Sequence, residues 1–407
     1  MLRPFNGHYS GPDSDGMTTL PPNLSHRSAV SPFLAMDVLR QANEQESAGR
    51  RVIHMELGEP GGPLPLLVRE AAAIALSQGD LGYGEALGER RLRRLIALNY
   101  QKRYGISVDP ERVIVTTGSS GAFVLTLLAG FDPGARIAVA SPGYPAYANI
   151  LHSLGLEAAP INFGADTGFA PTATALEEAH QRQKLHGALF MSPANPTGAM
   201  IPEAELAKIC NFCDAAGITF ISDEIYHGLE YEKAAQTALK FTDRALVINS
   251  FSKYYAMTGW RLGWVVAPKE WMRTLERLQQ SLAICPPRIS QQAALAAFDA
   301  TEELERNRCA YARNRDAFLN RLPSLGLKSW APPDGAFYIY ADVSCITADS
   351  YDLCQSLLHE AGVAVTPGID FDRQNGASWL RFSYAGAEKE VEEGLRRIEV
   401  WLNNQRG

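Results

Sequence analysis

The sequence predicts an α/β fold, with a large domain built on a mostly parallel sheet covered by helices and a smaller α+β domain. Short, continuous apolar runs alternate with helical stretches between about residues 52 and 289, which is typical of parallel strands buried on both faces. After Pro286 and Pro287 the pattern changes to long helices with a few strands. Polar residues and glycines follow the predicted strands directly, at the place where open α/β folds bind ligands.

The composition is that of an ordinary globular protein and disfavours several classes. The chain has 407 residues, enough for two domains, with 46% hydrophobic and 20% charged residues. A formal net charge of -7 gives no general attraction to nucleic acid or anionic lipid, so we expect neither as a partner. No apolar run reaches the roughly 18 residues of a membrane span. Without a charged-then-apolar signal pattern we expect a cytoplasmic protein, and residues 1–22, rich in Gly, Pro, Ser and Asp, as a disordered leader.

We assign residues 50–288 to the large domain and residues 23–49 plus 289–407 to the small domain. Runs rich in Val, Ile, Phe and Ala predict strands at residues 113–117, 137–140, 188–191, 219–222, 246–249 and 262–267. Helices between these strands include residues 121–129 and 202–216. In the small domain we predict helices at residues 290–322, 350–361 and 388–403, strands at 336–342 and 379–383, and a helix near 32–48 that docks onto it.

Two residue clusters have ordinary structural explanations. One is basic and is predicted to be a solvated helix face: Arg90, Arg91, Arg93 and Arg94. The other is a C-x-x-C pair, Cys210 and Cys213, which shares the spacing of an amphipathic core stripe with Leu206 and Ile209. No second cysteine pair or H-E-x-x-H motif accompanies it, so no metal site is predicted.

Three small residues and one aromatic residue follow the first two predicted strands. Gly118, Ser119 and Ser120 precede a helix, where free backbone N–H groups and hydroxyls form a natural phosphate cradle. Small residues also suit an ordinary strand-to-helix turn. Tyr144 could stack on a planar ring, although an aromatic side chain at a strand end is often simply packed. Each feature taken alone is a weak signal.

The next three predicted strands are followed by more specific residues. Asn195 lies in a turn-like Asn-Pro-Thr-Gly, and Asp223 ends a buried strand, where a carboxylate is costly unless it meets a cation. Either a structural arginine or a pyridinium nitrogen could be that cation. Lys253 lies beside a strand end, where a buried ammonium is unfavourable but an imine is tolerated. Arg261, eight residues later, can anchor a phosphate at the same place.

Together these residues meet the needs of pyridoxal 5′-phosphate (PLP), which requires a lysine, a carboxylate for its ring nitrogen, an aromatic side chain over its ring and a phosphate cradle. The strings Asn-Pro-Thr-Gly at 195–198, Asp-Glu-Ile-Tyr at 223–226 and Ser-x-Ser-Lys at 250–253 with Gly-Trp-Arg-Leu-Gly at 259–263 resemble the signature of class I/II aminotransferases. The resemblance covers nearly the whole chain from about Ser28. It implies the PLP-transferase fold type I of the aspartate aminotransferase superfamily, with a seven-stranded sheet in the large domain.

The resemblance also implies residue roles. Lys253 would be the Schiff-base residue and proton shuttle, Asp223 would pair with the ring nitrogen, and Tyr144 would stack on the ring. Asn195 and Tyr226 would bind the phenolic oxygen. The phosphate would be held by Gly118, Ser119, Ser120, Ser250 and Arg261.

Gly58, Asn195 and Arg381 match the substrate side of the family's site. Arg381 would bind the substrate α-carboxylate, and Gly58 would belong to the loop that closes over it. Tyr83 would reach the phosphate of a neighbouring subunit in a homodimer with shared active sites. The chain departs from the family at Gly61-Gly62, where an Asp-Phe pair is frequent, so the resemblance leaves the substrate's side chain open.

The expected reaction is ping-pong transamination between an L-amino acid and a 2-oxo acid. A PLP-dependent lyase, such as a C–S β-lyase or a decarboxylase, uses the same lysine and aspartate and stays an alternative. Ser250-x-x-Lys253 also matches the nucleophile motif of penicillin-binding enzymes, but the companion S-D-N and K-T-G motifs are missing. A dehydrogenase would need G-x-G-x-x-G after a strand, and residues 82–88 have the wrong spacing. A PLP-dependent regulator would need a DNA-binding domain, for which a short leader leaves no room.

Overall fold

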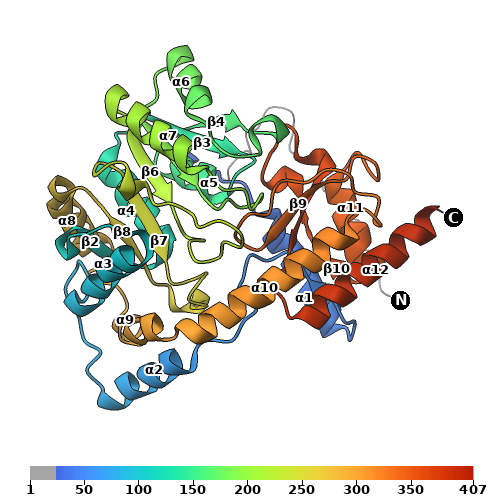
Figure 1. Ribbon diagram of the computed structural model, residues 1–407, viewed down its shortest axis with the longest axis horizontal. Helices are drawn as coiled ribbons and strands as arrows, with labels where there is room; N and C mark the ends of the chain where they lie inside the picture. The colour runs from blue at the N-terminus through green and yellow to red at the C-terminus, as the bar shows by residue number, and fades with distance from the viewer. Residues whose placement is uncertain (1–23, 407) are drawn as a thin grey trace.

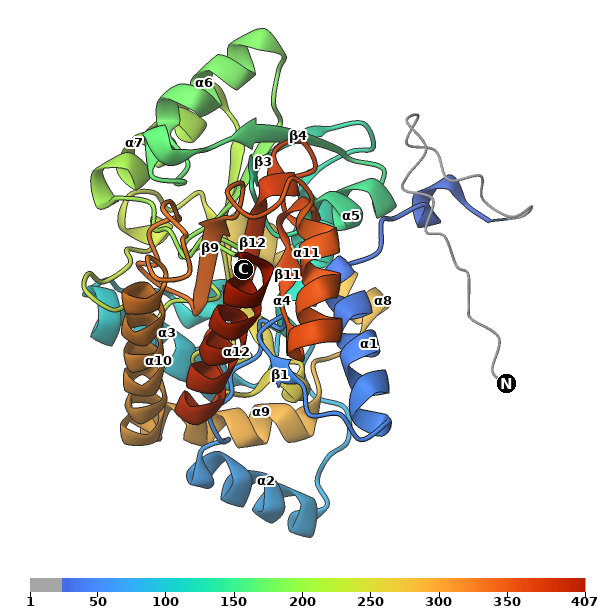
Figure 2. The ribbon, with the colours of Figure 1, turned by 90° about the vertical axis from the view of Figure 1, so that its right-hand side faces the viewer.

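The computed structural model describes residues 24–406 (Figures 1 and 2). The predicted disordered leader, residues 1–22, lies outside the described residues. The helices and the two main sheets are the elements that position the candidate site.

The centre of the molecule is a seven-stranded sheet with the order β2-β8-β7-β6-β5-β3-β4. Its strands are β2 (Val113–Thr116), β3 (Arg136–Ser141), β4 (Glu157–Asn162), β5 (Gly187–Met191), β6 (Thr219–Asp223), β7 (Leu246–Ser250) and β8 (Gly263–Val266). Six strands run in one direction and β8 runs against them, because β8 is antiparallel to both β2 and β7. The predicted mostly parallel sheet is confirmed.

The predicted strands are all present, but β4 was not predicted. It lies at the edge of the sheet and alternates exposed and buried residues, and it contains Pro160. An edge strand of this kind lacks the continuous apolar run that marks the central strands.

The two faces of this sheet build two separate cores. On β7, Leu246 and Ile248 face one core, and Val247 between them faces the other. The same alternation holds along β2, β3, β5, β6 and β8. Because both faces are covered, all of β2, β5, β7 and β8 is buried, as the apolar runs predicted.

Twelve α-helices surround the sheets in the described part of the chain (Figure 1). Their bounds are α1 (Leu34–Ser47), α2 (Leu66–Gln78), α3 (Arg90–Tyr104), α4 (Gly118–Gly130), α5 (Ala146–Ser153), α6 (Ala173–Arg182), α7 (Glu203–Ala216), α8 (Met272–Leu282), α9 (Arg288–Leu295), α10 (Thr301–Arg321), α11 (Ser350–Ser356) and α12 (Glu388–Arg406). α4 packs against β7 and β8, so its N-terminus lies at the edge of the sheet where β7 ends.

A second, antiparallel sheet lies in the C-terminal part of the chain, with the order β11-β12-β9. It consists of β9 (Tyr338–Asp342), β11 (Thr366–Pro367) and β12 (Trp379–Ser383). A short strand, β1 (Ile53–His54), pairs in parallel with β10 (Val363–Ala364). α1 packs beside these strands (Figure 2), and its Val38 and Ala42 form one buried cluster with Val52, Leu358 and Ala364. The exact division of the chain into a large and a small domain stays a prediction.

The predicted continuous helix at residues 290–322 is wrong, because the chain forms α9, a 3-10 turn at Ala296–Asp299 and then α10. The apolar pattern runs through this break, so periodicity alone could not detect it. Glu302 and Glu303 in the first turn of α10 do mark a new helix start, since acidic side chains stabilise helix N-termini. The predicted helix at 350–361 is α-helical only over Ser350–Ser356 and continues as a π-helical turn, Leu357–Ala361.

The prediction of a solvated arginine face is correct for Arg90, Arg91 and Arg94 but wrong for Arg93, which is 2% exposed. The Arg93 guanidinium donates to the carbonyl oxygens of Val113 (3.0 Å) and Pro110 (3.1 Å) and forms an ion pair of 2.9 Å with Glu111. These backbone acceptors compensate for the loss of solvent. The loop before β2 supplies them, and a helical pattern does not show that loop.

Cys210 and Cys213 lie buried on α7 as unpaired cysteines, which confirms core packing. Over residues 24–406 there is no group of three or more His, Cys, Asp or Glu side chains arranged to hold a metal ion. Within the same residues, no helix is long and apolar enough to cross a membrane.

Candidate active site

The candidate residues gather at one edge of the large sheet. β2, β3, β5, β6 and β7 are parallel, so their carboxyl ends lie on the same side, and β8 begins there. Ser250 at the end of β7 and Thr116 at the end of β2 both pair with Gly263. This topology brings together residues that lie more than a hundred positions apart in the chain.

Asp223 ends β6 and is 1% exposed. Its two carboxylate oxygens accept hydrogen bonds from the Tyr147 hydroxyl and from the Ile225 amide, the latter at 3.1 Å. Burial raises the pKa of Asp223 to about 7, because these bonds and the Lys253 ammonium only partly offset the loss of water. A cationic partner would stabilise this carboxylate, and the ring nitrogen of PLP is such a partner.

Tyr147 was not predicted as a site residue. It lies on α5, is 4% exposed and contacts the ring of Tyr144 edge-on, with 5.4 Å between ring centroids. In the sequence Tyr147 follows Tyr144 by three positions, and a hydrogen-bond role for it leaves no distinct pattern. Through Tyr147, the predicted stacking residue Tyr144 is placed beside Asp223.

Lys253 lies in the turn after β7, and its ammonium donates to the backbone carbonyl of Gly58. The same ammonium lies over the Tyr226 ring, 5.8 Å from its centroid. Burial lowers the pKa of Lys253 to about 8, and two nearby guanidinium groups lower it as well. Glu59 and Asp223 act in the opposite direction. A lysine with this pKa has an appreciable neutral, nucleophilic fraction near neutral pH.

Arg381 on β12 is 4% exposed and is held by a set of neutral groups. It donates to Asn195 Oδ1 at 2.9 Å, to Thr366 Oγ1 at 3.1 Å and to the Glu56 carbonyl. Its Nε has no hydrogen-bond partner among the described residues. A buried guanidinium with neutral partners and a free donor is suited to binding a carboxylate.

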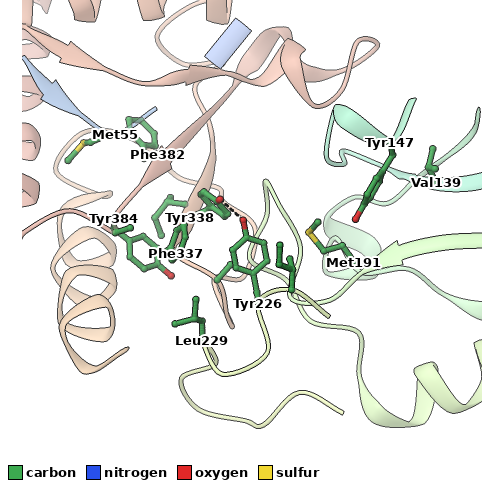
Figure 3. Packing of buried hydrophobic residues seen from close by; sticks show 14 of the residues in the cluster. Met55, Val139, Tyr147, Met191, Tyr226, Leu229, Phe337, Tyr338, Phe382 and Tyr384 are labelled. Atoms are coloured by element: carbon green, nitrogen blue, oxygen red, sulfur yellow. Dashed lines mark hydrogen bonds between the residues drawn. The ribbon is translucent and has the colours of Figure 1, made fainter. Parts of the chain in front are cut away.

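The Tyr226 hydroxyl forms a hydrogen bond of 2.6 Å with the hydroxyl of Tyr338 on β9 (Figure 3). The Tyr338 ring in turn lies against the Arg381 guanidinium, at 4.6 Å from the ring centroid to Cζ. Gly58 fits beside them because a Cβ there would overlap the Tyr338 hydroxyl. Four segments of the chain therefore meet at Tyr338, which was not predicted as a site residue.

The predicted phosphate cradle lies at the N-terminus of α4. Gly118 has φ +73°, a conformation that favours glycine, and a Cβ there would lie 2.7 Å from Arg261 Nη2. Arg261 is exposed, and its one hydrogen bond among the described residues goes to the Thr258 carbonyl, at 3.1 Å. A helix N-terminus beside a guanidinium group attracts an anion.

The predicted serines differ in their availability. Ser119 is half-buried and Ser120 is exposed, both in the first turn of α4, and the side chain of the N-cap residue Thr117 makes no capping hydrogen bond. The Ser250 hydroxyl is buried and accepts a hydrogen bond of 2.9 Å from the Ser252 amide. Ser250 nevertheless lies close to the N-terminus of α4. Gly263, which pairs with Ser250 across the strands, is packed against Gly118 and Ser119.

Tyr83 is the one predicted residue that the chain does not bring to the others. Its side chain is 82% exposed, and no contact of its ring or hydroxyl with the other candidate residues is found within residues 24–406. The Gly61-Gly62 segment, where the chain departs from the family, packs against α10: the Gly62 amide donates to the Tyr311 hydroxyl at 3.1 Å. A side chain at Gly62 would overlap Asn307, so a larger residue would require Asn307 to move.

These groups fit PLP in three independent ways. The buried carboxylate of Asp223 needs a cation, the lysine has a lowered pKa, and the helix N-terminus beside Arg261 can accept a phosphate. All three lie at the same edge of the sheet as the free donor of Arg381, where a substrate carboxylate could bind.

Comparisons with known proteins agree with this fit. Residues 50–398 match a family model described as aminotransferase class I and II. The chain is 49% identical over 383 residues to a valine–pyruvate aminotransferase of Mycobacterium tuberculosis, which covers 93% of this chain and 98% of that protein.

Solved structures show the same relationship. An aminotransferase from Mycobacterium tuberculosis superposes with a TM-score of 0.92 at 48% identity, covering 95% of this chain and all of that one. The aspartate aminotransferase of Thermus thermophilus with maleate gives a TM-score of 0.87 at 33% identity, covering 93% of this chain and 99% of that one.

Proposed function

Because the chain belongs to the class I and II aminotransferases, we propose that it transfers the amino group of a neutral L-amino acid to a 2-oxo acid, with valine and pyruvate as its pair. The relatives described above are named aminotransferases, which favours transamination over elimination or decarboxylation. The observation that carries the proposal is the meeting of Lys253, Asp223 and Arg381 at one edge of the sheet.

When bound, PLP supplies a conjugated ring that takes up the electron pair released when the donor loses its Cα proton. In our proposal Lys253 would hold the cofactor and, once released from it, would take the proton from the substrate Cα and return it to the substrate-cofactor adduct. Asp223, held by Tyr147, keeps the ring nitrogen protonated. Tyr226 and Asn195 bind the phenolic oxygen, and Tyr144 packs on the ring.

The remaining proposed roles concern binding. The phosphate is held by the N-terminus of α4 and by Gly118, Ser119, Ser120, Ser250 and Arg261. Arg381 binds the substrate α-carboxylate, and the loop at Gly58 covers it, since the Gly58 carbonyl already reaches Lys253. Closure of this loop would exclude water from the reacting atoms.

The proposed substrate has an uncharged side chain. The side chains in direct contact with Arg381 are neutral, namely Asn195, Thr366, Tyr338 and Phe371, so the guanidinium is left to pair with the substrate's α-carboxylate. The 49% identity to the Mycobacterium tuberculosis protein named for valine and pyruvate is what supports an uncharged side chain.

We expect the purified, PLP-loaded protein to convert valine faster than aspartate, with pyruvate as a good acceptor. The measurement is a panel of amino donors in single half-reactions, followed by the loss of the cofactor's absorbance, and then regeneration by a panel of 2-oxo acids. Preference for aspartate would contradict the neutral substrate. No absorbance change with any donor, or change without regeneration, would contradict transamination itself.

Replacing Arg381 by leucine should weaken donor binding without releasing PLP. Loss of a two-fold hydrogen-bonded ion pair of about 3 kcal/mol corresponds to roughly a hundredfold rise in the donor's KM. A matched control is Arg373→Leu, an exposed arginine three positions after Asp370, for which KM should stay unchanged.

The Arg381 variant also loses bonds to the protein, so circular dichroism must show that it is folded. Arg381→Lys keeps the charge and should show an intermediate KM if the carboxylate role is correct. A folded Arg381→Leu protein with unchanged KM would contradict the assignment.

We further propose a homodimer with shared active sites. The Tyr83 side chain is 82% exposed, and α2, which precedes it, exposes several large apolar side chains: Leu66, Leu67, Ile74 and Leu76. Exposed apolar residues gathered along one segment are typical of an interface. In a two-fold symmetric dimer the Tyr83 hydroxyl would reach the phosphate of the partner's cofactor.

Mixing two inactive variants tests this proposal. Tyr83→Ala, provided that it is inactive, and Lys253→Ala place their lesions on different chains, so a hybrid dimer has one site with both lesions and one with neither. Activity should return after subunit exchange, toward one intact site per hybrid. A mixture that stays inactive although exchange is demonstrated, or a fully active monomer by light scattering, would contradict shared sites.

A further inference from the structure

Tyr338 is buried completely and touches three groups to which the proposed function gives separate tasks. These groups come from distant segments: Gly58 before α2, Tyr226 after β6, and Arg381 on β12. Figure 3 shows Tyr226 and Tyr338 extending from different parts of the chain, with their hydroxyls facing each other.

The ring of Tyr338 contributes to holding Arg381. β9 and β12 are antiparallel with Tyr340 opposite Arg381, so Tyr338 is the diagonal neighbour on the same face of the sheet. The Arg381 guanidinium contacts two aromatic rings, with its Cζ 4.6 Å from the centroid of Tyr338 and 4.7 Å from that of Phe371. These two contacts restrict the orientations in which the guanidinium can meet a carboxylate.

The hydroxyl of Tyr338 contributes to holding Tyr226. Burial raises the pKa of both phenols, so both carry a proton at neutral pH and one must donate to the other. If Tyr226 donates its hydrogen bond to the cofactor's phenolic oxygen, its own oxygen has to accept the hydrogen bond that the Tyr338 hydroxyl donates. A phenol that accepts a hydrogen bond is also a stronger donor, because bonds in a chain polarise one another.

We propose that Tyr338 is a positioning residue that couples the cofactor to the substrate carboxylate: its hydroxyl donates to Tyr226, and its ring orients Arg381. This inference rests on the proposed function. Tyr338 is assigned no contact with the cofactor, and it acts only through Tyr226 and Arg381.

A spectrophotometric pH titration of the PLP-loaded protein tests the hydroxyl. A donor on the phenolic oxygen stabilises its negative charge and therefore lowers the pKa at which the linkage between PLP and Lys253 loses its proton. Tyr338→Phe keeps the ring and removes the hydroxyl, so the midpoint between the two absorbance bands should rise by about 0.5 pH units or more. A midpoint equal to that of the wild type would overturn the hydroxyl's role.

Tyr340→Phe is the matched control. Tyr340 lies two residues further along β9, is 1% exposed and packs on Trp379 rather than on Tyr226, with 4.8 Å between the ring centroids. The absorbance titration of Tyr340→Phe should have the same midpoint as that of the wild type. An equal rise in both variants would mean that any lost hydroxyl in this sheet shifts the titration, and would overturn the proposal.

A double-mutant cycle separates coupling from general disturbance. Tyr226→Phe should raise the midpoint more than Tyr338→Phe does, and the double variant should match Tyr226→Phe alone, because Tyr338 acts only through Tyr226. Additive shifts would overturn the coupling. The double variant removes both hydroxyls of the pair, so neither is left buried without a partner. If Tyr338→Phe alone folds poorly, the double variant can still be compared with Tyr226→Phe.

Kinetics test the ring. Tyr338→Phe should change the donor's KM by less than about threefold, whereas Tyr338→Leu, which removes the aromatic face, should raise it by about fivefold or more. Equal KM values in the two variants would overturn the orienting role. If the wild-type protein forms no titratable absorbance band with PLP, the proposed function fails as well. If the wild type titrates normally and the variants have the same midpoint, only the role of Tyr338 is overturned.

Discussion

Replacing Lys253 by alanine is expected to abolish transamination, with at least about a thousandfold loss of turnover. The variant loses the group that holds the cofactor and also the base that moves the proton. In the wild type the Lys253 amine is buried and has a pKa of about 8, and Lys253 is the one lysine among the described residues that acts on Asp223. The measurement is turnover with the best donor and acceptor, together with the absorbance spectrum after loading with PLP.

Lys240→Ala is the matched control, because Lys240 is a partly exposed lysine paired with Glu203 at 2.6 Å. It should retain wild-type turnover and the wild-type spectrum. A Lys253→Ala protein that is folded and retains more than about a tenth of wild-type turnover would show that another residue performs the proton transfer.

The second large effect is expected for Asp223→Ala. Removing one charge-stabilising group at the reacting centre costs about 3 kcal/mol or more, so Cα deprotonation should slow by roughly a hundredfold or more. Asp223 is suited to this task because its burial makes the carboxylate dependent on a cation. The protein should stay folded, because alanine removes the buried charge along with the hydrogen bonds.

Glu224→Gln is a close control for Asp223. Glu224 is the next residue, equally buried, and it accepts hydrogen bonds from Ser222 and from the Ala238 amide. Burial raises the pKa of Glu224 to about 8, so at neutral pH a neutral amide replaces a largely neutral acid. Its single-turnover rate should stay near that of the wild type. A rate for Asp223→Ala within about threefold of wild type would contradict the role of Asp223.

The sequence predicted the site well because the site depends on topology that the sequence reveals. Continuous apolar runs identify parallel strands, and the carboxyl ends of parallel strands share one edge. Asp223, Lys253 and Asn195 each follow such a run, so their meeting follows from the order of elements without any knowledge of distances. The seven strands and the single reversed strand agree with the fold implied by the resemblance.

The residues that the sequence did not reveal act through tertiary contacts. Tyr147 and Tyr338 are aromatic residues in an ordinary helix and an ordinary strand, and only packing brings their hydroxyls to Asp223 and Tyr226. Arg93 was misassigned for the same reason, since its acceptors are carbonyl groups from another segment. Local patterns record which face of an element is apolar, but they do not record what that face meets.

Tyr83 shows a different kind of limit. Neither its exposed side chain nor its glycine-flanked loop has an explanation within one chain, and the resemblance alone supplies a partner for it. Its role therefore stays a prediction that only the hybrid experiment can address.

The most direct test of the central claim is to map the residue that holds the cofactor. Wild-type protein loaded with PLP should be yellow, and borohydride should fix the cofactor covalently to one lysine. Trypsin does not cut at a modified lysine, so the label is predicted in a single peptide of residues 245–261, between Arg244 and the cleavage site at Arg261. Lys240→Ala should give the same labelled peptide and Lys253→Ala none. A label on any other lysine would contradict the account.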